Sequence, residues 1–150
     1  MSAQGAQPPV KITYSTMSGA QLEGLHSALD AEIPKVQARF GQTHPLWING
    51  HAVKTVESFK DTSPFDTRIL LGHFAKGSQG HVRDAINAAR AAFPAWSRTS
   101  WRERVKRLRR VASVIREHRW ELSVLMGFEA GKTRLECVGD VEESADLITY

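Results

Sequence analysis

The chain has 150 residues, of which 41% are hydrophobic and 24% are charged, and its formal net charge at pH 7 is +4. These values are ordinary for a globular domain with a core of its own. Apolar runs such as Ile69–Leu71 are far too short to cross a bilayer, and no basic segment followed by an apolar run marks a secretory signal. A single cysteine, Cys137, excludes an intramolecular disulfide and fits a reducing compartment. We therefore expect a cytoplasmic protein without membrane contact.

The first part of the chain is predicted to be a tail followed by a helix. Residues 1–17 are small, polar and proline-bearing, and we expect a flexible tail there. From Ser18, a good N-cap, apolar residues recur at spacings of three and four, which predicts a helical extension within residues 18–44. Pro34 is expected to kink this helix or divide it in two, with Gly41 ending the second piece. The apolar positions are Leu22, Leu25, Ala28, Leu29, Ile33, Val36 and Phe40.

Residues 45–74 show a strand-like pattern. The run Leu46–Ile48 leads into Asn49-Gly50, a dipeptide that favours a type I′ hairpin turn. A second turn is predicted at residues 63–67, and residues 68–74 are predicted to form the strand that follows it. We expect a small antiparallel β-ribbon, which must lie on another surface because so few strands are marginal alone.

The second half of the chain is predicted to be helical. Ser78 is expected to begin a helix that Pro94 stops, and Trp96 in the next connector is expected to anchor in the core. Two successive helices follow, with Thr99 as the N-cap of the first and Gly131 as the left-handed residue that ends the second. A last helix is predicted from about residue 134, and it has no stop signal before residue 150, as if it continued further.

Charge is unevenly distributed over these helices. Basic residues are concentrated between residues 102 and 119, whereas residues 134–150 are mainly acidic. This pattern favours two solvated helix faces that attract each other. The alternative is a basic helical module that binds nucleic acid or an acidic protein partner. The basic residues are Arg102, Arg104, Lys106, Arg107, Arg109, Arg110, Arg116 and Arg119.

No short motif predicts a catalytic site. The chain has no phosphate loop and no G-x-G-x-x-G after a strand, and the G-x-x-G at residues 77–80 follows a predicted strand, so we interpret it as a turn and N-cap. Cys137 lies near a helix start, which can stabilise a thiolate, but we interpret it as a small buried structural thiol. The histidines never pair at i, i+3 or i+4, which argues against a zinc site. They are His26, His44, His51, His73, His81 and His118.

Five landmarks nevertheless occur in order. They are PLWING at residues 45–50, Ser63-Pro64, AINAARAAFPAW at residues 85–96, Arg104 after Thr99, and EAGK at residues 129–132. Their succession, over residues 45–150, resembles the N-terminal part of the NAD(P)-dependent aldehyde dehydrogenase superfamily. The preceding RFG at residues 39–41 and HPL at residues 44–46 resemble the branch that oxidises L-glutamate γ-semialdehyde in proline catabolism, the 1-pyrroline-5-carboxylate dehydrogenases.

The resemblance implies an α/β fold with a Rossmann-like cofactor domain, of which residues 45–150 form an incomplete N-terminal part. It also implies NAD or NADP as the cofactor of the complete enzyme, the remainder of the enzyme chain as partner, a homo-oligomer, and no nucleic acid. The family's nucleophilic cysteine, general-base glutamate and oxyanion-hole asparagine come later than Tyr150. We therefore expect no catalytic or cofactor-binding residue in these 150 residues, and no activity of the chain alone. Where family members hold a structural monovalent cation, the matching positions are Thr62, through its backbone carbonyl, and Glu129, through its side chain.

Overall fold

The computed structural model describes residues 17–150, so all but the last residue of the predicted tail lies outside the described part. Most of that part is helical, with short strands between the first and second helices, as predicted. The helices are α1 (Gly19–Gln37), α2 (Gln79–Arg98), α3 (Trp101–Glu117), α4 (Arg119–Ala130) and α5 (Arg134–Thr149). The strands are β1 (Gln42–His44), β2 (Leu46–Ile48), β3 (His51–Val53), β4 (Ser58–Thr62) and β5 (Leu70–Ala75).

Helix α1 is continuous, so of the two outcomes predicted for Pro34, a kink or a division, the division is wrong. The Ser18 hydroxyl accepts a hydrogen bond from the backbone N–H of Gln21, and the Gln21 side chain accepts one from the Ser18 N–H, which together make a capping box. Pro34 removes one backbone donor near the C-terminal end of the helix. Beyond it the buried Val36 still holds the last turn against the core, and the helix therefore continues to Gln37.

The strands that follow α1 in the sequence include a three-stranded sheet with the order β1-β5-β4. Strands β4 and β5 pair antiparallel, which confirms the predicted ribbon, whereas β1 pairs parallel to β5. The polar segment QTH of β1 shows no apolar alternation, and this is why the sequence did not predict it. An aromatic row crosses the three strands: the His44 ring stacks on Phe74 with centroids 4.8 Å apart, and Phe74 lies 5.8 Å from Phe59.

Strands β2 and β3 form a separate antiparallel hairpin. Its two turn residues are Asn49 and Gly50, with φ values of 52° and 75°. Positive φ at both positions is what a type I′ turn requires, so the prediction from the Asn-Gly dipeptide is confirmed.

Helix α2 runs through Pro94 to Arg98, so the prediction that Pro94 stops it is wrong. Past the proline, the hydroxyls of Ser97 and Thr99 donate hydrogen bonds to the carbonyls of Pro94 and Ala95 and so support the last turn. The predicted core anchor is also wrong, because Trp96 is 41% exposed. The N-cap of α3 is Ser100 instead of Thr99, since its hydroxyl accepts from the Glu103 N–H.

The buried core lies where α1, α4 and α5 meet. Helix α4 ends at Gly131, as predicted, with φ 66° and its N–H donating to the Gly127 carbonyl at 3.1 Å. The left-handed residue turns the chain sharply, so that α5 returns beside both α3 and α4. The core residues from the three helices are Leu25, Leu29, Val36, Val124, Leu135 and Val138.

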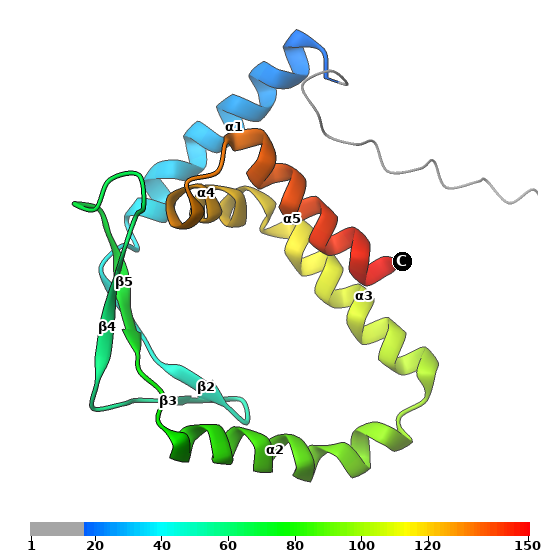
Figure 1. The fold of residues 1–150 in the computed structure, drawn as a ribbon. Coiled ribbons are helices and arrows are strands. Elements are labelled where there is room, and N and C mark those ends of the chain that lie inside the picture. Colours follow the sequence, from blue (N-terminus) through cyan, green and yellow to red (C-terminus); the bar gives the residue numbers. More distant parts are fainter. Residues whose placement is uncertain (1–16) are drawn as a thin grey trace, which may run out of the picture.

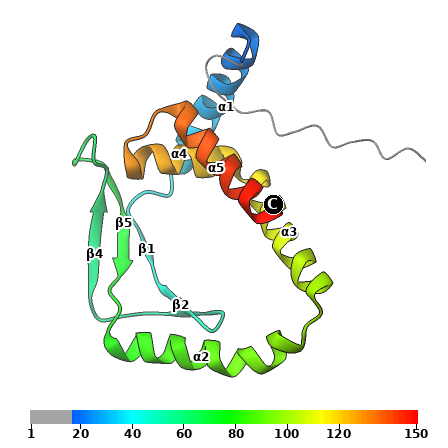
Figure 2. The ribbon, with the colours of Figure 1, turned by 45° about the vertical axis from the view of Figure 1, so that its right-hand side comes forward.

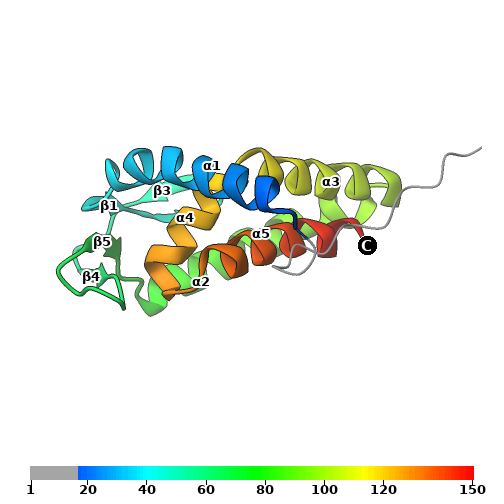
Figure 3. The same cartoon turned by 90° about the horizontal axis from the view of Figure 1, so that it is seen from above.

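The elements form an open frame (Figures 1 and 2). The three-stranded sheet makes one side, α2 with the β2–β3 hairpin beside it makes the next, and α3 with α5 makes the third, while α1 and α4 close the corner. Viewed from above, the frame is thin (Figure 3). None of the residues of α2 is buried, although its apolar stripe includes Val82, Ile86 and Phe93. Among the described residues, no helix combines the length and apolar character needed to cross a membrane.

Candidate functional site

The two predicted cation ligands lie on either side of a junction between the sheet and α4. Ser63, which is fully buried and directly follows β4, donates from its hydroxyl to the backbone carbonyl of Phe128 at 2.6 Å. Thr62 directly precedes Ser63, and Glu129 directly follows Phe128. One hydrogen bond therefore brings the chain neighbours of both predicted ligands to the same place in the fold.

The electrostatics of this junction are unusual for a surface carboxylate. Burial raises the pKa of Glu129 above its ordinary value, the nearby Asp61 raises it further, and His44 lowers it. Asp61 and His44 lie on the two outer strands of the sheet, β4 and β1. Sequence reasoning missed both, because the proximity of β1 to β4 follows only from the parallel pairing of β1 with β5.

The donors at the junction are oxygens of a kind that hard cations prefer. Burial and the nearby Asp61 both disfavour the ionised form of Glu129. A bound cation would stabilise that negative charge. Within residues 17–150, no group of three or more His, Cys, Asp or Glu side chains could hold a metal ion. The oxygen donors of the junction also differ from the nitrogen and sulfur ligands that zinc and other transition metals prefer.

Cys137 is 1% exposed and lines the wall between α4 and α5. Its thiol donates weakly to the Lys132 carbonyl at 3.7 Å. Burial, with a further contribution from Asp140, raises the pKa of the Cys137 thiol. A nucleophilic cysteine needs the opposite shift, so the interpretation of Cys137 as a structural thiol is supported.

The basic α3 and the acidic α5 lie side by side, as the charge pattern predicted (Figure 1). Arg116 donates to Asp146 at 2.5 Å and lies 3.5 Å from Glu142, and Arg119 at the start of α4 lies 3.6 Å from the same carboxylate. These pairs neutralise one end of the basic stretch within the chain. The G-x-x-G at residues 77–80 is a turn and N-cap: Ser78 caps α2 by accepting from the His81 N–H.

The fold and the sequence landmarks together indicate one class of protein. The chain belongs to the aldehyde dehydrogenase family, whose model matches residues 47–150. The 1-pyrroline-5-carboxylate dehydrogenase of Staphylococcus epidermidis is 37% identical to it over 119 residues, which are 79% of this chain and 23% of that protein. This chain therefore spans about a quarter of the length of the curated relatives it matches.

Solved structures show the same fold. The NAD-bound 1-pyrroline-5-carboxylate dehydrogenase from Thermus superposes with a TM-score of 0.81 at 26% identity, covering 100% of this chain and 28% of that one. The NAD-dependent aldehyde dehydrogenase from Sinorhizobium meliloti gives a TM-score of 0.71 at 29% identity, covering 78% of this chain and 24% of that one. The predicted resemblance to the aldehyde dehydrogenase family, and within it to the 1-pyrroline-5-carboxylate dehydrogenases, is confirmed.

Proposed function

We propose that this chain forms the N-terminal part of the cofactor domain of an enzyme that oxidises L-glutamate γ-semialdehyde to L-glutamate with NAD(P)+. The observation that carries the proposal is the complete coverage of the chain by the Thermus 1-pyrroline-5-carboxylate dehydrogenase, set against 78% for the Sinorhizobium aldehyde dehydrogenase. Helix α1 also precedes the family match, which begins at residue 47. The Thermus 1-pyrroline-5-carboxylate dehydrogenase thus covers α1 as well as the part that matches the family model. This supports glutamate semialdehyde, instead of another aldehyde, as the substrate.

The chain's own role in that enzyme is structural. Its exposed apolar side chains on α2 and α3 need a covering surface, since each large apolar residue gains about 1.5–3 kcal/mol when fully buried. We propose that the remainder of the enzyme polypeptide supplies this surface and that the complete enzyme is a homo-oligomer in the cytoplasm. These side chains are Val82, Ile86, Phe93, Trp96, Trp101, Leu108 and Val111.

Residues 17–150 carry out no catalytic step in this enzyme. Cys137 is buried with a raised thiol pKa, and no glycine-rich phosphate cradle is present among the described elements. The nucleophile, general base and oxyanion donor then belong to polypeptide outside these 150 residues. When bound there, NAD(P)+ supplies the hydride acceptor for the oxidation.

The test uses the polypeptide encoded by the whole open reading frame that contains this sequence. Purified protein should form NADH or NADPH with glutamate semialdehyde, and the 150-residue chain alone should not. A folded full-length product that oxidises other aldehydes but not glutamate semialdehyde contradicts the substrate. Turnover by the 150-residue chain that Cys137→Ala abolishes contradicts the assignment of catalysis elsewhere.

We also propose that the Thr62 carbonyl and the Glu129 carboxylate hold a structural monovalent cation, with Asp61 adding negative charge. The full-length protein should then melt at a higher temperature in potassium or sodium chloride than in tetramethylammonium chloride of equal ionic strength. Tetramethylammonium is too large to enter such a site, so its chloride salt controls for the screening of charges by ions. Glu129→Gln should abolish the difference, and an equal difference in the variant contradicts the site.

A further inference from the structure

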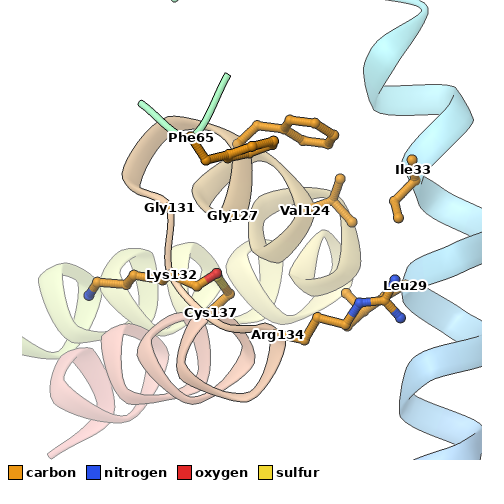
Figure 4. A pocket seen from close by; sticks show the side chains of 10 residues that line it. Leu29, Ile33, Phe65, Val124, Gly127, Gly131, Lys132, Arg134 and Cys137 are labelled. Carbon is orange, nitrogen blue, oxygen red and sulfur yellow. The ribbon is translucent and has the colours of Figure 1, made fainter. Parts of the chain in front are cut away.

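An apolar cavity of about 250 Å³ lies between α1, the β4–β5 loop and the turn from α4 to α5 (Figure 4). It is small for a ligand pocket, and so suits a compact molecule instead of a nucleotide. Leu29 and Val124, both buried, form its inner wall, and the half-buried Ile33 lies on the α1 side. The aromatic ring of Phe65 on the loop lies 5.6 Å from that of Phe128 on α4, and both rings line the cavity.

Two glycines keep the cavity open on the α4 side. Gly127 and Gly131 line it with backbone alone. A Cβ atom on Gly127 would lie 3.7 Å from the Cys137 sulfur, and one on Gly131 would lie 3.7 Å from a Pro64 carbon. Any longer side chain at Gly127 would therefore project toward the Cys137 wall and reduce the space.

The cavity has one charged edge. The Arg134 guanidinium lies beside Leu29, whereas the Lys132 ammonium points away and pairs with Asp140 (Figure 4). Arg134 is held in place from α1, where it donates to Asp30 at 2.6 Å and lies 3.3 Å from the His26 ring nitrogen. No acidic residue lines the cavity. Asp30 and His26 engage two of the five N–H groups of Arg134, and the remaining ones can donate to a ligand. An apolar space with these donors at its edge is complementary to an apolar tail that carries a carboxylate.

One wall of the cavity comes from outside the family match. Leu29 and Ile33 belong to α1, and so do both groups that hold Arg134, while the family model begins at residue 47. The space is therefore made by the addition of α1 to the family elements α4 and α5. The two proposed cation ligands, Thr62 and Glu129, do not line it, although Phe128 next to Glu129 does.

We propose that this cavity binds a compact monocarboxylate with an unbranched or aromatic apolar tail, of which hexanoate is a representative. The tail lies between Leu29, Val124 and Phe65, and the carboxylate accepts hydrogen bonds from Arg134. Phe65 is 60% exposed on a loop, so its ring can move aside to admit the ligand.

The test is calorimetric titration of the polypeptide encoded by the whole open reading frame that contains this sequence, with hexanoate, 1-hexanol and hexylamine. Hexanoate should bind about tenfold or more tightly than either analogue, because only it pairs with the guanidinium. Ile33→Trp, which fills the α1 side, should weaken hexanoate binding at least about tenfold. Leu147→Trp, the same change at a position on α5 that is 71% exposed, is the matched control and should leave the affinity within about twofold.

The decisive variant is Arg134→Gln. Because Arg134 also joins α1 to α5, its loss can lower stability, so the readout is the ratio of the hexanoate and hexanol affinities. This ratio should fall to about 1. Equal binding of hexanoate and hexanol by the unaltered chain, no binding of either at millimolar concentration, or unchanged binding in Ile33→Trp each overturns the proposal.

Discussion

The Ser63 hydroxyl and the Phe128 carbonyl form a 2.6 Å hydrogen bond that fixes the end of β4 to the last turn of α4. Ser63 is fully buried and Phe128 is half-buried, and removal of the hydroxyl leaves the Phe128 carbonyl without this donor. We expect Ser63→Ala to lower the free energy of unfolding by about 1–3 kcal/mol, the cost of a buried polar group left without a partner. Urea unfolding followed by circular dichroism measures this change.

Ser144→Ala is the matched control for that substitution. The Ser144 hydroxyl also donates to a backbone carbonyl, that of Asp140 at 2.8 Å, but on the exposed face of α5. Its removal should change the free energy of unfolding by less than about 0.5 kcal/mol. Equal effects of the two substitutions would show that the Ser63 bond contributes nothing beyond an ordinary surface contact.

A second prediction concerns the ion pair between Arg134 and Asp30, which joins α5 to α1 across 104 residues of sequence. Both side chains are about half exposed, so water and salt screen the pair. A double-mutant cycle with Arg134→Gln and Asp30→Asn should give a coupling free energy of about 0.2–1 kcal/mol that falls in 1 M salt. A coupling above that range, unaffected by salt, would show that the pair is effectively buried.

A third prediction concerns the thiol of Cys137. Its burial and raised pKa both lower the fraction of reactive thiolate at the protein surface. Ellman's reagent should therefore label the native chain at least about a hundredfold more slowly than the chain in 8 M urea. A fast native reaction would contradict the structural role of this thiol and reopen a chemical one.

The helices and turns that were correctly predicted are those with a local cause. The Asn49-Gly50 turn and the Gly131 helix end each depend on a residue that tolerates positive φ. Ser18 caps α1 through a hydrogen bond to Gln21, only three residues away. The errors at Pro34 and Pro94 share a different cause. A proline removes only one backbone donor, and packing of Val36 or hydroxyl bonds from Ser97 and Thr99 hold the turn that follows.

In the candidate site, too, the features that depend on contacts between distant residues were not predicted. Thr62 and Glu129 were predicted through a family resemblance, whereas the bond that joins their neighbours, from Ser63 to Phe128, spans 65 residues and has no sequence signal. Trp96 was predicted as a core anchor because it is large and apolar. It is instead half exposed on α2, since the surface that the amphipathic pattern requires is not among residues 17–150.

A fourth prediction tests the nucleic-acid alternative. Arg116 already pairs with Asp146 and Glu142, Arg107 with Glu103, and Arg110 with Glu117. We expect random-sequence duplex DNA to bind weakly, with an affinity that is lost at physiological salt. Fluorescence anisotropy over a salt series measures this. Tight binding at physiological salt, with a slope that indicates several released counterions, would favour the basic-module alternative.

The last prediction concerns the pH dependence of stability at the junction of α1, α3 and α4. Glu121 accepts a hydrogen bond from Arg39, which follows α1, and its carboxylate lies 3.0 Å from the ring nitrogen of His118 between α3 and α4. Arg39 first, and then His118, lower the pKa of the Glu121 carboxyl below its ordinary value of 4.5. The folded state therefore favours the ionised carboxylate more than the unfolded state does.

A depressed carboxyl pKa contributes stability that is fully present above pH 4.5 and is lost as the pH falls through the lower folded-state value. Glu121→Gln should then lower the free energy of unfolding at pH 7 by about 0.5–1 kcal/mol, and by much less at pH 3. Glu143→Gln, at an exposed position on α5, is the control and should leave both values nearly unchanged. A Glu121→Gln deficit of the same size at pH 7 and pH 3 would show that Glu121 stabilises the junction by packing and not by its charge.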